Sequence, residues 1–503
     1  MISTEQLRDS LEQDKFYAPI FGDDGAVLER KKGLVRRTYE TFLAQYGDVD
    51  RVGVFHVPGR LEFTAGKHTD YVGLPVPNFA VDRGFIVLAA PGSDDMVSMA
   101  EADDRWARIA FDSGDLGKDI PPLEVPFRAE GKGDRNWRRY PMSVLQRLLS
   151  DFDRNHNFRG ARLAFSSDLP PASGMSSSSA LMVMTLIGYS SATGLLRSEH
   201  FRGTIAGRDY EGTLQNLALY AACCENGADF RNVHKDILLE GRAGVGTFGG
   251  SQDHVAMLLG RRGYLGINDF RPIRHIEDIP WPDDLAVVVC YAQPASKTES
   301  AREGFNRLRR RADEVAKVVG KWAGKDGGYQ HIGAVIDDIQ SLERDKIENL
   351  LRSKAAYRED KLLARWEMAC VQAVRHLPEV IECLRESNYP RLGEVTNREH
   401  ALSYLNLENI SPLVDTLQKC AVVSGAYGAS GFGGGFGGSL FSLVGSEESG
   451  EFMQEWRERG RPHLEKFQET RPDLRYSPTF FQVRPSSGAC RLFEKERRLF
   501  PSG

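Results

Sequence analysis

The segment that most constrains the fold runs from Pro170 to Ala180 and reads PPASGMSSSSA. It follows a strand-like segment at 161–165 and precedes an apolar, helix-like segment at 181–189. In such a unit the small residues let backbone N–H groups surround an anion, which also meets the positive end of the helix dipole. The segment has no Gly-Lys-Ser/Thr sequence, so it is not an ordinary P-loop. We therefore predict a phosphate site, with a flexible serine-rich surface loop as the alternative.

Composition excludes several classes of protein. The chain has 503 residues, of which 41% are hydrophobic, enough for large cores in more than one domain. The net charge is −5, and no basic block with interleaved aromatic residues points to nucleic acid. No apolar segment reaches the length of a membrane span, and the first residues lack the layout of a signal peptide. The seven scattered cysteines form neither a disulfide framework nor a zinc-site pattern, so we expect a soluble, cytoplasmic protein without a structural metal.

The order of the apolar patterns predicts mixed α/β structure followed by helices. Helices are expected within 12–46, 135–156, 208–225 and 244–260, and across most of 299–398, where the charged stretch 318–365 suggests an insertion. Strands are expected at 52–57, 84–89 and 285–291, on either side of 425–438, and within 476–494.

Two further small-residue segments carry possible chemistry. The glycine-rich turn 246–254 opens a helix with Asp253 in its first turns, where a carboxylate could take the proton from a substrate hydroxyl during phosphoryl transfer. A helix-capping Asp is the alternative. Segment 428–438 contains seven glycines in eleven residues, which allows close backbone approach to a ligand or to another loop. A low-complexity linker would not be embedded between apolar strands.

Together with the segment Pro58–Tyr71, PGRLEFTAGKHTDY, these segments resemble the three ordered motifs of the GHMP small-molecule kinases, and specifically of the galactokinases. Pro58–Tyr71 resembles the galactokinase signature, the serine loop is similar to the family's phosphate-binding motif, and 428–438 to its third motif. Further similar segments are Asn136–Tyr140, Gly249–His254, Leu392–His400, Ile410–Pro412 and Pro485–Cys490. The resemblance covers roughly residues 20–495.

The resemblance implies the two-lobed α/β fold of the GHMP kinases. Residues 1–285 would form a ribosomal-protein-like amino-terminal lobe, and residues 286–503 a ferredoxin-like, partly helical carboxy-terminal lobe. The active site would lie between the lobes. The implied activity is transfer of the γ-phosphoryl group of ATP to a sugar hydroxyl, usually at the anomeric carbon, with Mg²⁺ bound alongside the nucleotide.

The resemblance also implies roles for individual residues. Asp253 would be the catalytic carboxylate, and Arg60 beside it would keep it ionised and offset charge on the transferring group. The metal ligands would be Ser178 and Glu225, with Glu240 as an alternative because 27 residues separate Glu225 from Asp253, more than the family norm. The expected cofactor-binding residues are Ser173, Gly174, Met175, Ser176, Ser177, Ser178, Ser179 and Ala180.

The expected sugar contacts are Lys67, His68, Asp70, Gly250 and Phe305. Two of them depart from the family pattern: Lys67 stands where galactokinases usually have a Glu, and Phe305 where they have a Tyr. An ammonium group favours a carboxylate partner, so Lys67 would suit a uronic acid such as galacturonate. The alternative is that Lys67 faces solvent or pairs with Glu62 in an otherwise ordinary galactokinase.

We therefore predict a galactokinase-like sugar-1-kinase that uses MgATP. Its expected partners are a small sugar and ATP, with no nucleic acid or membrane, and we expect a monomer or a weak dimer. Alternatives are a GHMP kinase for a related sugar or another small alcohol, and a non-catalytic sugar sensor. Such sensors tend to lose the serine loop or the catalytic Asp, and this chain has both.

Overall fold

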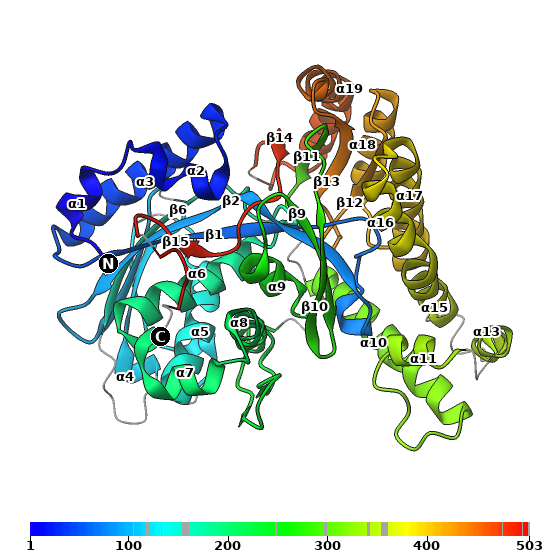
Figure 1. Ribbon diagram of the computed structural model, residues 1–503, viewed down its shortest axis with the longest axis horizontal. Helices are drawn as coiled ribbons and strands as arrows, with labels where there is room; N and C mark the ends of the chain where they lie inside the picture. Colours follow the sequence, from blue (N-terminus) through cyan, green and yellow to red (C-terminus); the bar gives the residue numbers. More distant parts are fainter. Residues whose placement is uncertain are drawn as a thin grey trace.

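Two β-sheets organise the computed structural model of this chain (Figure 1). The structure describes residues 1–500 except 104, 117–119, 132, 153–159, 247–248, 296–298, 340–342, 354–360, 475 and 495. Among the residues it describes, the larger sheet has nine strands and the smaller sheet four. No described helix is both long enough and apolar enough to cross a lipid bilayer.

The bounds of the elements are as follows. The strands are β1 (Gly53–Glu62), β2 (Val76–Pro91), β3 (Met96–Glu101), β4 (Arg108–Asp112), β5 (Arg128–Glu130), β6 (Ala161–Ser167), β7 (Phe230–Arg231), β8 (Leu238–Leu239), β9 (Tyr264–Phe270), β10 (Ile273–Pro280), β11 (Leu285–Gln293), β12 (Gly428–Gly431), β13 (Gly438–Gly445), β14 (Thr479–Val483) and β15 (Cys490–Arg491). The α-helices are α1 (Thr4–Arg8), α2 (Ala18–Phe21), α3 (Gly25–Tyr46), α4 (Ser113–Leu116), α5 (Arg139–Phe152), α6 (Ser177–Ala192), α7 (Glu199–Ile205), α8 (Tyr210–Asn226), α9 (Gln252–Leu259), α10 (Glu299–Trp322), α11 (Ile332–Asp337), α13 (Arg344–Ser353), α15 (Leu362–Val371), α16 (Leu377–Arg385), α17 (Tyr389–Leu402), α18 (Pro412–Val423) and α19 (Ser449–Thr470).

The larger sheet is covered by helices on both faces. Its strand order is β10-β9-β2-β6-β3-β4-β5, and β1 pairs with β2 and β15. Helices α1 to α3 pack on one face, and α5 to α9 pack on the other (Figure 1). All ten residues of β1 are buried, which is why its sequence does not alternate between apolar and polar residues.

The smaller sheet lies between two hydrophobic cores. Its order is β12-β13-β11-β14, and all its pairs are antiparallel. Successive side chains of a strand point to opposite faces. Accordingly, Val287 and Val289 of β11 join the main core, while Val288 and Cys290 belong to the separate core beneath α18 and α19.

The change of sheet supports our proposal of two lobes that divide near residue 285. β10, in the larger sheet, ends at Pro280, and β11, in the smaller sheet, begins at Leu285. Close to the carboxy terminus the chain returns to the larger sheet, where β15 pairs with β1 and Cys490 lies opposite His56. The proposed lobes are therefore 1–285 and 286–503, and one strand of the second lobe, β15, belongs to the sheet of the first.

Most of the elements predicted from the sequence are present, with differences in length. The helix expected at 208–225 is α8, which ends before Gly227, a residue in the left-handed conformation at φ +75°. The strands expected at 52–57 and 84–89 belong to longer strands, so β1 continues through Arg60 to Glu62. The suggested insertion at 318–365 is helical where it is described, but 340–342 and 354–360 lie outside the described residues.

Candidate active site

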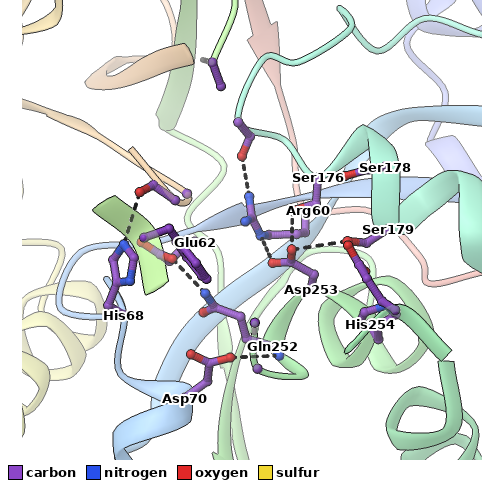
Figure 2. Close-up of a pocket in the computed structure, with 18 of the residues that line it drawn as sticks. Arg60, Glu62, His68, Asp70, Ser176, Ser178, Ser179, Gln252, Asp253 and His254 are labelled. Atoms are coloured by element: carbon purple, nitrogen blue, oxygen red, sulfur yellow. Dashed lines mark hydrogen bonds and ion pairs between the residues drawn. The ribbon is translucent and has the colours of Figure 1, made fainter. Parts of the chain in front are cut away.

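A pocket with a volume of about 230 Å³ lies where loops from both sheets meet. The end of β1, the serine loop and the start of α9 supply one part of its lining, and α10 and the loop between β12 and β13 supply another. Figure 2 shows the polar side chains that converge on this pocket. Three segments that lie far apart in the sequence, around Arg60, Ser178 and Asp253, therefore share one cavity.

Asp253 is the point of convergence in this pocket (Figure 2). Arg60 Nε donates to Asp253 Oδ1 at 2.6 Å, and Ser176 Oγ donates to Oδ2 at 2.5 Å. Ser179 Oγ lies 3.5 Å from the same Oδ2. The side chain of Asp253 remains 24% exposed, which leaves it open to a molecule in the pocket.

The environment keeps Asp253 ionised. Burial by itself raises the pKa of this carboxyl, but the Arg60 guanidinium and the hydrogen bond from Ser176 outweigh burial, and the pKa lies below its usual range. A charged carboxylate that is partly open to a pocket can accept a proton from a bound hydroxyl. The alternative role, helix capping, does not describe Asp253, because α9 begins after Ser251.

The serine loop forms the wall next to Asp253. Ser176 takes the left-handed conformation at φ +54° immediately before α6, and the first residues of that helix, whose N–H groups have no partner within the helix, line the pocket. Gly174, Ser176, Ser177, Ser178 and Ser179 line the pocket. The other three predicted cofactor-binding residues are buried behind this wall: Ser173, Met175 and Ala180.

The third glycine-rich segment packs against the serine loop. A Cβ at Gly433, whose φ is +72°, would lie 2.6 Å from the carbonyl oxygen of Gly174, and one at Gly438 would lie 3.3 Å from that of Ser173. Gly433 and Gly434 also line the pocket. The close backbone approach predicted for 428–438 is therefore an approach to another loop, and it holds the serine loop in place.

Replacing Gly433 with Ala is expected to raise the KM for the nucleotide expected from the sequence, ATP, roughly tenfold to a hundredfold, because the added methyl pushes Gly174 out of position. Steady-state kinetics with varied ATP would measure the effect. The matched control is Gly47→Ala, which has nearly the same φ, +71°, but open space around the Cβ position. The control should lose stability through backbone strain and keep its KM, whereas equal KM values in the two variants would contradict this account of Gly433.

On the other side of Asp253 lie the residues predicted to contact a sugar. His68, Asp70, Gly250 and Phe305 all line the pocket. Both His68 ring nitrogens have protein neighbours: Nδ1 lies 2.7 Å from the Tyr71 hydroxyl, and Nε2 lies 3.1 Å from the Asn409 amide nitrogen. Burial lowers the pKa of His68 to about 3, so this ring is neutral at physiological pH.

Asp70 and Gly250 are in direct contact. A Cβ at Gly250 would collide with the Asp70 carboxylate, so a larger residue here would displace that carboxylate. The backbone N–H of Gln252 donates to Asp70 Oδ2 at 3.4 Å. Burial, followed by the nearby charge of Asp253, raises the pKa of Asp70. The start of α9 therefore positions both the Asp253 carboxylate and the Asp70 carboxylate.

Lys67, the other expected sugar contact, is not among the residues that line the pocket. The residue is only 4% exposed, so it does not face solvent. Glu62, which is two residues after Arg60 on β1, lines the pocket instead. Glu62 lies on the same face of β1 as Arg60, because side chains two residues apart in a strand point the same way.

Of the two glutamates considered as metal ligands, only Glu225 lines the pocket; Glu240 is exposed elsewhere. Glu225 Oε2 lies 3.1 Å from His254 Nε2. Neither atom has hydrogen-bond geometry with any partner among the described residues. Glu225 Oε2 is thus a buried carboxylate oxygen without a hydrogen bond, and its residue lines the same pocket as Ser178. Such an oxygen fits a cation that would arrive with a nucleotide.

Comparisons with known proteins agree with this geometry. Models of three families match in order along the chain: the galactokinase galactose-binding signature at 40–91, the GHMP kinases N terminal domain at 139–226, and the GHMP kinases C terminal at 380–461. The galactokinase of a Roseiflexus species is 26% identical over 409 residues, which cover 80% of this chain and 86% of that protein. The galactokinase of Haemophilus influenzae is 24% identical over 420 residues, which cover 82% and 89%.

Solved structures share the fold. The crystal structure of Lactococcus lactis galactokinase complexed with galactose superposes with a TM-score of 0.61 at 20% identity, covering 90% of this chain and 98% of that one. Methanococcus jannaschii mevalonate kinase superposes with a TM-score of 0.50 at 15% identity, covering 86% and 98%. At these sequence identities, the structural similarity establishes a shared fold and nothing further.

The fold and the ordered family matches indicate the class: the chain is similar to the GHMP kinases in both of their conserved domains, and this similarity implies the use of ATP. The galactose-binding signature and the similar galactokinases then narrow the assignment. Within the GHMP kinases the similarity is to the galactokinases, and the chain is a galactokinase-like phosphotransferase.

Proposed function

We propose that this protein transfers the γ-phosphoryl group of ATP to the anomeric hydroxyl of galactose, forming galactose 1-phosphate and ADP. One observation carries the proposal: an ionised carboxylate, Asp253, lies between the serine loop on one side and the His68–Asp70 segment on the other. A nucleotide phosphate on the first side and a sugar on the second would both reach it. The galactose-binding signature at 40–91 supports galactose as the sugar.

The proposed reaction moves one proton and one phosphoryl group. The anomeric O–H donates its proton to Asp253, the sugar oxygen bonds to the γ-phosphorus, and the bond from that phosphorus to the bridging oxygen of ADP breaks. Because Arg60 keeps the carboxylate ionised, Asp253 orients the hydroxyl and accepts its proton as the new bond forms. The Arg60 guanidinium also offsets negative charge on the transferring group.

The remaining nucleotide contacts are proposed for the serine loop and α8. Backbone N–H groups from Gly174 to Ser179 would surround the phosphates at the start of α6. Ser178 and Glu225 would hold Mg²⁺. When bound, Mg²⁺ neutralises charge on the β- and γ-phosphates. The place of Glu225 in the pocket lining, with an Oε2 atom that no hydrogen bond occupies, favours Glu225 over Glu240.

The sugar contacts are proposed for His68, Asp70 and Gly250, with Phe305 as an apolar wall. Phe305 lies 5.4 Å from the His68 ring, measured between ring centroids. His68 is neutral and hydrogen-bonded on both sides, so it presents a fixed ring to the pocket. Asp70 supplies a carboxylate acceptor for a ring hydroxyl.

A coupled ADP-release assay over a sugar panel tests the proposal. The panel contains galactose, galacturonate, glucuronate, arabinose, fucose and glucose, each assayed with Mg²⁺ titrated against ATP. We expect galactose to give the highest kcat/KM, with a product that carries phosphate on the anomeric oxygen. Turnover of another sugar above galactose would contradict the proposed substrate. Sugar binding without any turnover would contradict a kinase and favour a sugar sensor.

A further inference from the structure

Glu62 is a buried carboxylate in the pocket for which the proposed phosphoryl transfer has no use. It ends β1, is 2% exposed and lines the same cavity as Asp253 and Asp70. Gln252 Nε2 donates to Glu62 Oε2 at 2.9 Å, so the carboxylate is held in one orientation (Figure 2). Gln252 is itself fixed at the start of α9, next to Asp253. Glu62 is therefore rigidly placed in the wall where the sugar is proposed to bind.

A buried ammonium, that of Lys67, interacts electrostatically with this carboxylate. Lys67 Nζ has no hydrogen-bond partner among the described residues, and the carboxylates that attract it are Glu62 and Glu399. Glu399 is not part of the pocket lining; its carboxylate contacts Gln372 and His376. Lys67 thus interacts electrostatically with one pocket carboxylate and one outside the pocket lining, and its charge partly compensates that of Glu62.

The groups on this wall are mostly acceptors. Glu62 and Asp70 are carboxylates, and the side-chain oxygen Oε1 of Gln252 is buried without a donor among the described residues. An array of acceptors needs donors, which a sugar hydroxyl supplies and a carboxylate does not. A uronic acid would bring further negative charge to this wall, while the compensating Lys67 lies out of its reach.

We propose that Glu62 determines sugar specificity: it accepts a hydrogen bond from a sugar hydroxyl and thereby selects a neutral sugar over the matching uronic acid. The inference rests on the proposed sugar-kinase function and adds which feature of the sugar is recognised. Gln252 acts as the positioning residue for Glu62, and Lys67 as its buried counter-ion. Burial raises the pKa of Glu62 and lowers that of Lys67, and their mutual attraction opposes both shifts.

The test compares Glu62→Gln with the wild type on galactose and galacturonate. The amide keeps the size of the side chain but loses the charge and gains a donor, so it should tolerate a carboxylate better. We expect the ratio of kcat/KM for galactose to that for galacturonate to fall roughly tenfold to a hundredfold. An unchanged ratio would overturn the inference.

Glu399→Gln is the matched control. It also removes a buried carboxylate that attracts Lys67, but it touches no part of the pocket. If Glu62 acts only as a structural partner of Lys67, both variants will lower the melting temperature and leave the sugar ratio alone, which would overturn the inference. A shift of the ratio in Glu62→Gln alone supports it.

A second measurement covers the case in which Glu62→Gln folds poorly, and it uses the wild type and Glu62→Asp. Monodeoxy analogues of galactose remove one hydroxyl at a time, and the analogue that lacks the hydroxyl facing Glu62 should lose about a hundredfold in kcat/KM with the wild type. Glu62→Asp shortens the reach of the carboxylate, so its loss on that analogue should be much smaller. Equal losses in the two proteins would overturn the inference. Wild-type protein that phosphorylates no sugar would instead overturn the proposed function.

Discussion

Replacing Asp253 with Asn is expected to lower kcat roughly a thousandfold, while the KM values for galactose and ATP change less than about threefold. The amide keeps the shape of the side chain and can still accept the hydrogen bond from Ser176, so the pocket walls should stay in place. It cannot accept the proton of the sugar hydroxyl. Initial rates of ADP release, together with melting temperatures, would measure the effect.

Asp168→Asn is the matched control for this prediction. Asp168 is also a buried carboxylate, but it pairs with Arg30 and Lys31 and lies outside the pocket lining. Burial alone would raise its pKa, but Lys31 and Arg30 hold the pKa at about 2. The control should therefore lose stability and keep kcat. A variant Asp253→Asn that retains more than about a tenth of the wild-type kcat would show that Asp253 does not take the proton.

Replacing Arg60 with Met is expected to lower kcat/KM roughly a hundredfold to a thousandfold and to change its pH dependence. Without the guanidinium, burial dominates and the pKa of Asp253 rises above its usual range. The reaction needs the carboxylate ionised, and a carboxyl is ionised only above its pKa. The acidic limb of the pH profile should therefore move to higher pH, with the greatest loss of activity on the acidic side.

Arg60→Lys separates charge from geometry at this position. Lysine restores a positive charge beside Asp253, but it cannot reproduce the pair of bonds from Nε to Asp253 and from Nη1 to the carbonyl oxygen of Gly174, each 2.6 Å long. We expect the acidic limb to return toward that of the wild type while kcat stays reduced. An acidic limb that does not move in Arg60→Met would mean that another group controls the ionisation of Asp253.

Local sequence patterns were sufficient to predict the elements that supply most of the pocket lining. The strand, the serine loop and the helix at 161–192 could be predicted because each has a short-range sequence signal. These signals are a strand-like segment, a run of small residues and a continuous apolar segment. The start of α9 at Gln252 and the end of α8 before Gly227 follow from glycine signals of the same range. The order of these motifs along the chain then indicated the GHMP kinase fold.

The sequence by itself therefore determined which segments would form the serine loop and the turn that carries Asp253, because those features depend on neighbouring residues. Only the tertiary structure decided which face of β1 meets the pocket, and with it that Glu62 is in the lining. The burial of Lys67 outside that lining was likewise decided by tertiary packing. It likewise chose Glu225 over Glu240 as the pocket residue and placed the third glycine-rich segment against the serine loop. These outcomes depend on strand register and on packing between segments hundreds of residues apart, and no local pattern encodes either.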